Sequence, residues 1–358
     1  MLVYNLLYGL ILIGLVVSGL KFHLGLNKLY WITSMLIIGI IGFRDETFGT
    51  DTYEYLQFFL NPDNRATYYG DIGVEPLYEL FNRIMGLFTH NKYVYLFILT
   101  VFSVLPVMML IKKYSSNPFL SIFLYISFSV GMSMFFLSFS MLRQFLAIGL
   151  YSLGIYFYIE NKQRFNKKVI LTLLCMVLCH YSSLIVLALL ALDKYTLNKK
   201  FYWVVLFFSV FFGLLINIFF PYLEMFATMT GTSFYLTSNI DNSSYSFVSK
   251  MPFLFIYGYI LYFSSKEIYN SFWVKGLFLA VCFGNILTFG TNADRICSYF
   301  YLTALIAVPY SLEHLKVSQY LNASYLVIVI AYFTYKYYVT FDIVKDSLYI
   351  LAPYKSCF

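Results

Sequence analysis

The sequence predicts an all-α fold, a polytopic transmembrane helical bundle of about 10–12 segments. Of the 358 residues, 61% are hydrophobic and 11% are charged, whereas an average soluble domain has about 25% charged residues. The hydrophobic residues also form repeated apolar runs of helix-spanning length. Helices are favoured because each one satisfies its own backbone hydrogen bonds in hydrocarbon, and the short alternating segments of a β-barrel are not apparent.

The apolar runs are expected to form the helices in chain order. They lie at residues 3–20, 29–43, 93–111, 119–137, 142–159, 168–192, 201–220, 251–264, 273–290, 296–311 and 321–338. The first run lacks a basic start and a small-residue cleavage site, so we expect a retained helix rather than a signal peptide. Residues 1–358 are predicted to form a single membrane domain. Two polar connections, 44–91 and 221–250, are predicted to be periplasmic loops, the first with short amphipathic helices.

The predicted sidedness depends on the run at 168–192. Short lysine-rich loops belong in the cytoplasm by the positive-inside rule, and this run has a basic loop at each end, at 160–168 and 193–200. A single crossing would place these two loops on opposite sides of the membrane. Because the polar stretch 179–183 interrupts the run, we predict a broken or re-entrant segment there.

This topology turns both termini and both long loops outward and gathers Arg44, Arg143 and Arg295 on the outer face. Each arginine lies at the end of an apolar run, where a charge is costly without a partner. A single arginine in such a place can also snorkel to the lipid headgroups. Clustered guanidinium groups, however, suit a lipid phosphate or pyrophosphate, because each planar fork binds phosphate oxygens in two places.

Asp51 and Glu75 are candidate general bases next to these arginines. Asp51 has two interpretations: it caps a helix over 52–60, with Glu54 completing a capping box, or it binds a sugar hydroxyl. Glu75 precedes Pro76, which is expected to start a second short helix. It either complements the dipole of that helix or serves as the base.

The helix after Glu75 is expected to lie along the membrane surface, because its apolar residues share one face. These residues are Leu77, Leu80, Phe81 and Ile84. Glu79 and Arg83 are spaced as an ordinary i,i+4 ion pair.

His180 is the third candidate base, in the middle of an apolar run and followed by Ser182 and Ser183. A neutral imidazole there either relays a proton or makes an interhelical hydrogen bond. A serine nucleophile would need an orienting acid, which the local sequence does not supply. Asp294 precedes Arg295 and is a candidate helix cap.

No nucleotide-binding or metal-binding motif is apparent, so we predict no cofactor and no metal. Cys175 and Cys179 precede His180 without a further ligand cluster, so they are expected to be buried thiols rather than metal ligands. The formal charge of +7 follows from cytoplasmic lysines and arginines and does not indicate a nucleic-acid partner.

The pattern resembles the EpsG/Wzy-like bacterial polysaccharide polymerases, which join lipid-linked sugar repeat units. The residues that carry the resemblance are Arg44, Gly49, Thr50, Asp51, Tyr55, Glu75, Pro76, Arg143, Gln144, Ala147, His180, Tyr181, Ser182, Arg295 and Tyr299. The resemblance covers residues 44–299, and the Arg44 to Tyr55 segment is its most distinctive part.

The resemblance implies a GT-C-like membrane glycosyltransferase without a cofactor in the bacterial inner membrane, with its active face periplasmic or extracellular. Its substrates would be undecaprenyl-pyrophosphate-linked oligosaccharides, and a chain-length regulator protein would be a further partner. Arg44, Asp51, Glu75, Arg143, His180 and Arg295 would be catalytic. Thr50, Tyr55, Gln144, Ser182, Asp294 and Tyr299 would bind substrate.

Three other functions fit parts of the pattern. A flippase for the same lipid-linked sugars could also use buried arginines, but repeat-related halves are not obvious in the sequence. An O-antigen-ligase-like transferase would share the arginine chemistry. A membrane O-acyltransferase would depend on His180.

Overall fold

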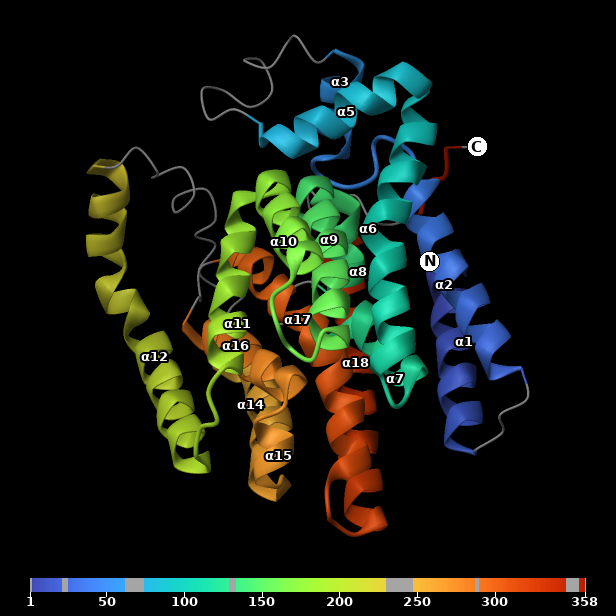
Figure 1. Ribbon diagram of the computed structural model, residues 1–358. Coiled ribbons are helices and arrows are strands. Elements are labelled where there is room, and N and C mark those ends of the chain that lie inside the picture. Colours follow the sequence, from blue (N-terminus) through green and yellow to red (C-terminus); the bar gives the residue numbers. More distant parts are fainter. Residues whose placement is uncertain are drawn as a thin grey trace. The chain divides into compact units, whose positions relative to one another are not determined.

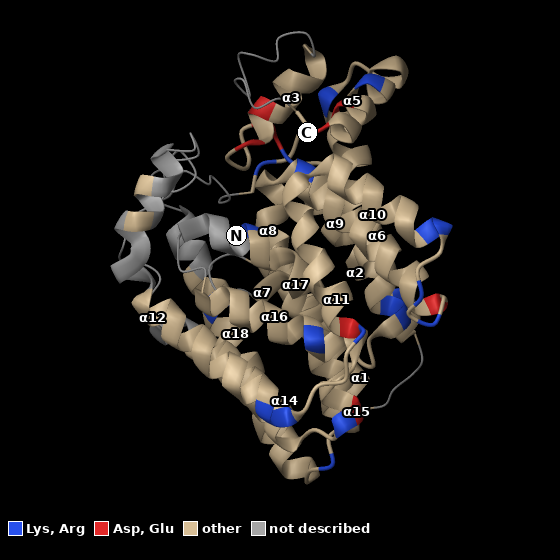
Figure 2. Cartoon of the chain, turned by 60° about the vertical axis from the view of Figure 1, so that its left-hand side comes forward, with Lys and Arg blue, Asp and Glu red and all other residues tan. Residues whose placement is uncertain are grey.

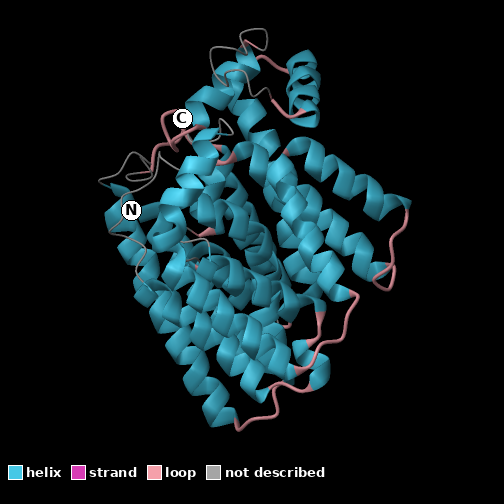
Figure 3. Ribbon diagram, turned by 90° about the vertical axis from the view of Figure 1, so that its left-hand side faces the viewer, coloured by secondary structure: helices cyan, strands magenta, loops and turns pink. Residues whose placement is uncertain are grey.

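The computed structural model in Figure 1 describes residues 2–20, 25–61, 74–128, 133–229, 247–286, 290–345 and 354–357. Within these residues the regular elements are helices (Figure 3), together with one isolated antiparallel bridge between Arg44 and Ser356. The predicted all-α fold is therefore confirmed.

Four helical stretches in the described residues are long and apolar enough to cross a membrane. They are α1 (Leu2–Gly19), α6 (Lys92–Tyr114), α9 (Leu142–Glu160) and Arg295–His314 within α17 (Gly290–His314). Shorter apolar stretches accompany them: Leu26–Gly42, Pro118–Ser127, Tyr181–Asp193, Met251–Phe263 and Phe272–Ile286. The chain is a multi-pass membrane protein.

Two of the expected helices are divided. The run at 119–137 forms α7 (Pro118–Ser127) and α8 (Met134–Ser140), so the expectation of one helix there was wrong. The sequence SFSVGMS at 127–133 supplies the reason, because serine and glycine are weak helix formers.

The predicted break within 168–192 is confirmed. Helix α10 (Lys167–Cys179) ends just before His180, whose backbone is extended with φ −161° and ψ 111°. A 3₁₀ helix, η2 (Tyr181–Val186), and α11 (Leu187–Asp193) follow. The polar residues that predicted the break therefore lie where the α-helix is interrupted.

The first compact unit contains Met1–Ile126, Phe135–Leu184 and Tyr337–Phe358. Helices α2 (Leu26–Gly42), α6, α9 and α10 pack in that order, with α1 beside α2. Helices α3 (Thr52–Leu60) and α5 (Pro76–Phe88) pack together across one end of these helices, in the blue and cyan part of Figure 1. This end carries the candidate site.

Helix α5 starts at Pro76 as predicted, and it packs on the side away from the apolar edge formed by Leu80 and Ile84. Tyr78, Asn82 and Met85 are buried, whereas Leu80 and Ile84 are exposed. The exposed apolar edge, which continues through Leu87 and Phe88, suits the predicted location at the membrane surface.

The second unit, Ser127–Met134 and Ile185–Lys336, is built around α16 (Phe272–Ile286). Helices α11, α12 (Lys199–Met229), α14 (Phe247–Phe263), α15 (Lys266–Tyr269) and α17 pack against α16. The Nζ of Lys275 on α16 donates to the carbonyls of Asp193 and Tyr195, which fixes the end of α11. Most of α18 (Gln319–Lys345) also belongs to this unit.

Helix α12 continues past the expected end at residue 220 to Met229. Residues 221–229 are thus helical, and 230–246, the larger part of the predicted loop 221–250, lie outside the described residues.

Gly149 provides a test of the α6–α9 packing. A Cβ atom built at Gly149 would lie 2.3 Å from the carbonyl oxygen of Phe102, so Gly149→Ala must push the two helices apart. We expect a loss of about 1–3 kcal/mol in the free energy of unfolding, as is typical of overpacking. Gly39→Ala is the matched control, because its nearest contact would be 3.9 Å away. Equal unfolding midpoints for the two variants in detergent would contradict this packing.

Candidate functional site

Glu75, Arg143 and His180 form a cluster at the α3–α5 end of the first unit. The Glu75 carboxylate joins the other two residues: Nη1 of Arg143 lies 2.6 Å from Oε2, and Nδ1 of His180 lies 2.7 Å from Oε1. Glu75 is 5% exposed, while Arg143 and His180 remain partly accessible. We call these three residues the carboxylate cluster.

Each member of the carboxylate cluster lies at a helix terminus. Glu75 occupies the N-cap position of α5, where the helix dipole favours an anion. Arg143 is the second residue of α9, where the dipole disfavours a cation. His180 follows the last residue of α10. The ion pair with Glu75 therefore compensates Arg143 for an unfavourable position.

Opposing effects act on the pKa of Glu75. Burial raises it, but the hydrogen bond with His180 and the positive charge of Arg143 outweigh burial and lower the pKa from 4.5 to about 2. Glu75 is thus ionised at every physiological pH. Such a weak base is poorly suited to removing a proton from a hydroxyl.

Tyr55 on α3 extends the carboxylate cluster. Its hydroxyl lies 3.3 Å from Nε of Arg143, and the guanidinium carbon lies 5.7 Å from the centre of its ring. Contacts on two sides hold the Arg143 side chain in one orientation. Figure 2 shows acidic and basic residues around α3 and α5, above helices that are mostly uncharged.

Arg44 lies in the same unit but is 0% exposed. Its guanidinium donates to the carbonyl of Ile41 at 2.5 Å and to that of Phe139 at 2.8 Å, and it lies 3.3 Å from the Thr52 hydroxyl. Ile41 and Phe139 are at the C-terminal ends of α2 and α8. Helix C-termini carry partial negative charge, so two of them compensate the buried cation.

Gly49 permits the close approach of the Arg44 segment to Phe139. Its φ is +93°, and a Cβ atom there would lie 2.5 Å from the Phe139 carbonyl oxygen. The same oxygen lies 2.8 Å from the hydroxyl of Thr52. Both the positive φ and the space require glycine, which explains physically why this residue belongs to the segment.

The structure brings together four of the predicted site residues: Tyr55, Glu75, Arg143 and His180. Gln144 follows Arg143 and is buried, and Ser182 is exposed on η2. The backbone N–H of Thr50 donates to the Ser140 hydroxyl at 3.2 Å.

Asp51 precedes α3 as expected, but its side chain makes no capping hydrogen bond, so the capping-box interpretation was wrong. Its backbone explains this, because φ −104° and ψ −1° are not the extended values usual for an N-cap.

Arg295, Asp294 and Tyr299 are on α17 in the second unit. Arg295 is partly exposed and Tyr299 is buried, while the side chain of Asp294 lies outside the described residues. The predicted grouping of Arg295 with Arg44 and Arg143 stays a prediction.

Sequence reasoning missed two features of this site. The orienting acid for His180, which the local sequence does not supply, is Glu75, 105 positions away. Thr52 and the Phe139 carbonyl, which bind Arg44, were also missed. The hydroxyl of Thr52 marks it as a possible hydrogen-bonding residue, whereas a backbone carbonyl cannot be recognised from the sequence.

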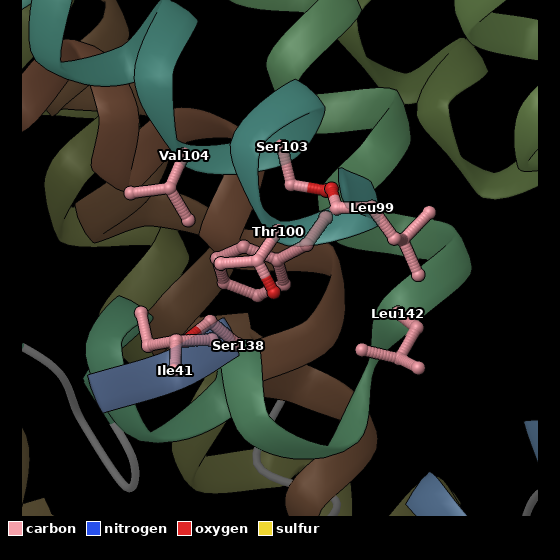
Figure 4. Close-up of a pocket in the computed structure, with 8 residues that line it drawn as sticks. Ile41, Leu99, Thr100, Ser103, Val104, Ser138 and Leu142 are labelled. Carbon is pink, nitrogen blue, oxygen red and sulfur yellow. The ribbon is translucent and has the colours of Figure 1, made fainter. Parts of the chain in front are cut away.

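A small cavity lies between α2, α6 and the α8–α9 corner (Figure 4). Its lining includes Ile41, Thr100, Ser103 and Ser138, and it has room for about one water molecule. Thr100 and Ser103 already donate to carbonyls of their own helix. This cavity is too small for a sugar. In the described residues, no group of three or more His, Cys, Asp or Glu side chains could hold a metal ion.

Comparison with known proteins gives a family match. A family model described as the EpsG family matches residues 27–356, a range that includes the carboxylate cluster and the Arg44 segment. No curated protein and no solved structure matches the chain.

The low pKa of Glu75 predicts how the stability of the protein depends on pH. A carboxylate whose pKa is lowered by folding stabilises the protein above its unfolded pKa, and this stabilisation is lost as the pH falls towards the folded pKa. We expect Glu75→Gln to lower the unfolding midpoint in detergent at pH 7, and the difference from the unaltered protein to shrink between pH 4.5 and pH 2.

Glu79→Gln is the control, because the Glu79–Arg83 pair is on the same helix with Arg83 exposed and should contribute little. A Glu75→Gln difference as large at pH 3 as at pH 7 would contradict the assignment.

Proposed function

Because the chain belongs to the EpsG family, which supports a polysaccharide-polymerase-like role, we propose that it joins undecaprenyl-pyrophosphate-linked repeat units into O-antigen, capsular or exopolysaccharide. The observation that carries the proposal is the carboxylate cluster. It combines a histidine oriented by a carboxylate with an arginine at a helix N-terminus. A base and an anion-binding group are the two requirements of this glycosyl transfer.

In the proposed reaction, a hydroxyl of the incoming unit attacks the anomeric carbon of the growing chain. A new carbon–oxygen bond forms, the bond to the pyrophosphate oxygen breaks, and the lipid pyrophosphate leaves with the bonding electrons. The hydroxyl proton passes to Nε2 of His180. Glu75 accepts the Nδ1–H hydrogen bond, which fixes the tautomer that leaves Nε2 as the base and stabilises the imidazolium that forms.

This assignment distinguishes between the candidate bases. Glu75 is too weak a base at a pKa of about 2, so it orients His180 instead of removing the proton itself. Asp51 stays a candidate for binding a sugar hydroxyl.

Arg143 would stabilise the departing pyrophosphate. It is next to the N-terminal backbone N–H groups of α9, and helix N-termini bind phosphate groups. A permanent charge in this position needs no metal to act on the leaving group. Arg295 is the proposed second arginine for the pyrophosphate.

Arg44, by contrast, is proposed to position the site and not to touch substrate. Its contacts tie α3 to the α8–α9 corner. Tyr55 lies one turn after Thr52 on α3, and Arg143 lies four residues after Phe139. Arg44 therefore fixes α3, which carries Tyr55, relative to the α8–α9 corner, which carries Arg143.

The direction of α9 and α10 supports an outward-facing site. Arg143 is at the start of α9 and His180 at the end of α10, so the connection between these helices lies at the opposite end of the unit. That connection contains Lys162 and Arg164, and Lys167 starts α10 directly after it. The positive-inside rule would put these three residues in the cytoplasm. The carboxylate cluster would then face the periplasm or the cell exterior.

The cluster suits a transferase, because glycosyl transfer always needs a group that accepts the hydroxyl proton, whereas a flippase needs such a group only where transport is coupled to protons. An O-antigen-ligase-like transferase would use the same residues on a different acceptor, and the reaction products distinguish the two activities.

The direct test incubates purified protein with a synthetic undecaprenyl-pyrophosphate-linked repeat unit and separates the products by size. We expect a ladder of increasing lengths. Arg143→Ala should lower the rate at least about 100-fold, the usual effect of removing one group that stabilises developing charge. Arg83→Ala should leave the rate unchanged, since Arg83 is exposed and its ion pair among the described residues is the one with Glu79 on the same helix.

Absence of any ladder from folded protein would contradict the proposed polymerase. A ladder from Arg143→Ala at the normal rate would exclude Arg143 from the reaction.

A further inference from the structure

The segment Tyr354–Cys357 pairs with the chain next to Arg44. The N–H of Asp45 donates to the Lys355 carbonyl and the N–H of Cys357 donates to the Phe43 carbonyl, each at 2.9 Å. These two bonds flank Arg44 and Ser356, which face one another as an antiparallel bridge. Nothing in the motif pattern of the sequence predicted this pairing.

Tyr354 anchors the segment through its side chain. The hydroxyl donates to the Ile40 carbonyl near the end of α2 at 3.0 Å. The ring packs edge-on against Tyr4, with centres 6.0 Å apart, and against Phe48, at 5.4 Å. Lys355 and Ser356 have exposed side chains, so their part of the pairing uses backbone atoms.

We propose that Tyr354–Cys357 is a positioning strand for the active site, and that Tyr354 is its positioning residue. The proposal rests on the polymerase function proposed above. The strand covers Arg44, which contacts Thr52 and the Phe139 carbonyl. Thr52 and Phe139 fix the positions of α3 and the α8–α9 corner, and these two segments carry Tyr55 and Arg143. The strand therefore acts on Arg143 through Arg44.

The physical consequence of removing the strand is specific. Arg44 is fully buried and compensated by two carbonyls and a hydroxyl. Without the strand, water would reach the guanidinium and compete for those acceptors, because hydration is the alternative to pairing for an exposed charge. The family match extends to residue 356, so the shared part of the chain includes most of the strand.

Substitutions test the role of the side chain. Tyr354→Ala should lower the catalytic rate constant for ladder formation at least about 10-fold while leaving KM within about 2-fold, because positioning affects Arg143 at the transition state. Tyr354→Phe, which keeps both ring contacts, should recover most of the rate. Lys355→Ala, whose side chain is exposed, is the control. A normal rate for Tyr354→Ala in folded protein would overturn the proposal.

A disulfide tests whether the strand stays paired while the enzyme works. Phe43 is opposite the native Cys357 in the bridge, and Cα atoms of such pairs are about 5.5 Å apart, within the range for a disulfide. Phe43→Cys should therefore form a cross-link on oxidation, and the cross-linked protein should retain its rate within about 2-fold. The double variant Phe43→Cys/Cys357→Ser controls for oxidation elsewhere.

Failure to cross-link, or cross-linked protein that loses activity and regains it on reduction, would overturn the positioning role. The cross-link is detected on gels without any polymerase assay. If unaltered protein makes no ladder, the proposed function fails, and the cross-link still reports whether the pairing exists.

Discussion

The Glu75 carboxylate is the constraint on which the candidate site depends. It is almost fully buried, and one oxygen pairs with Arg143 while the other pairs with His180. The helix dipole disfavours Arg143 at the start of α9, so this arginine depends on the Glu75 carboxylate. His180, directly after the end of α10, binds the other oxygen of the same carboxylate. A single carboxylate therefore links three helix termini, and Arg143 and His180 cannot move independently.

A second layer of contacts fixes these helix termini. Arg44 binds the C-terminal ends of α2 and α8, Gly49 lets its segment approach Phe139, and the strand at Tyr354 covers the arrangement. The most deeply buried charge described in the unit thus has a supporting role, while the partly accessible Arg143 is the one suited to substrate. Burial distinguishes two arginines that the sequence treats alike.

The sequence predicted the all-α membrane fold and the break before Ser182, because hydropathy and polar interruptions act locally. It also placed α3 from the expected cap at Asp51, although that side chain makes no capping hydrogen bond, and it placed α5 from Pro76 and the apolar spacing. It did not separate α7 from α8, because the mostly apolar run at 119–137 was given more weight than the serine and glycine residues within it. It selected Glu75, Arg143 and His180 by type, but their contacts connect residues up to 105 positions apart and depend on tertiary packing. The strand at Tyr354 depends on backbone hydrogen bonds, which no side-chain pattern reveals.

Glu75 is expected to make Arg143 and His180 work as one unit. The most direct measurement is the rate of ladder formation by Glu75→Ala, His180→Ala and the double variant in purified protein. If Glu75 acts through His180, the double variant should be no more than about 3-fold slower than the slower single variant, because residues acting as a unit are not additive. Losses that multiply in the double variant would show that Glu75 and His180 act independently.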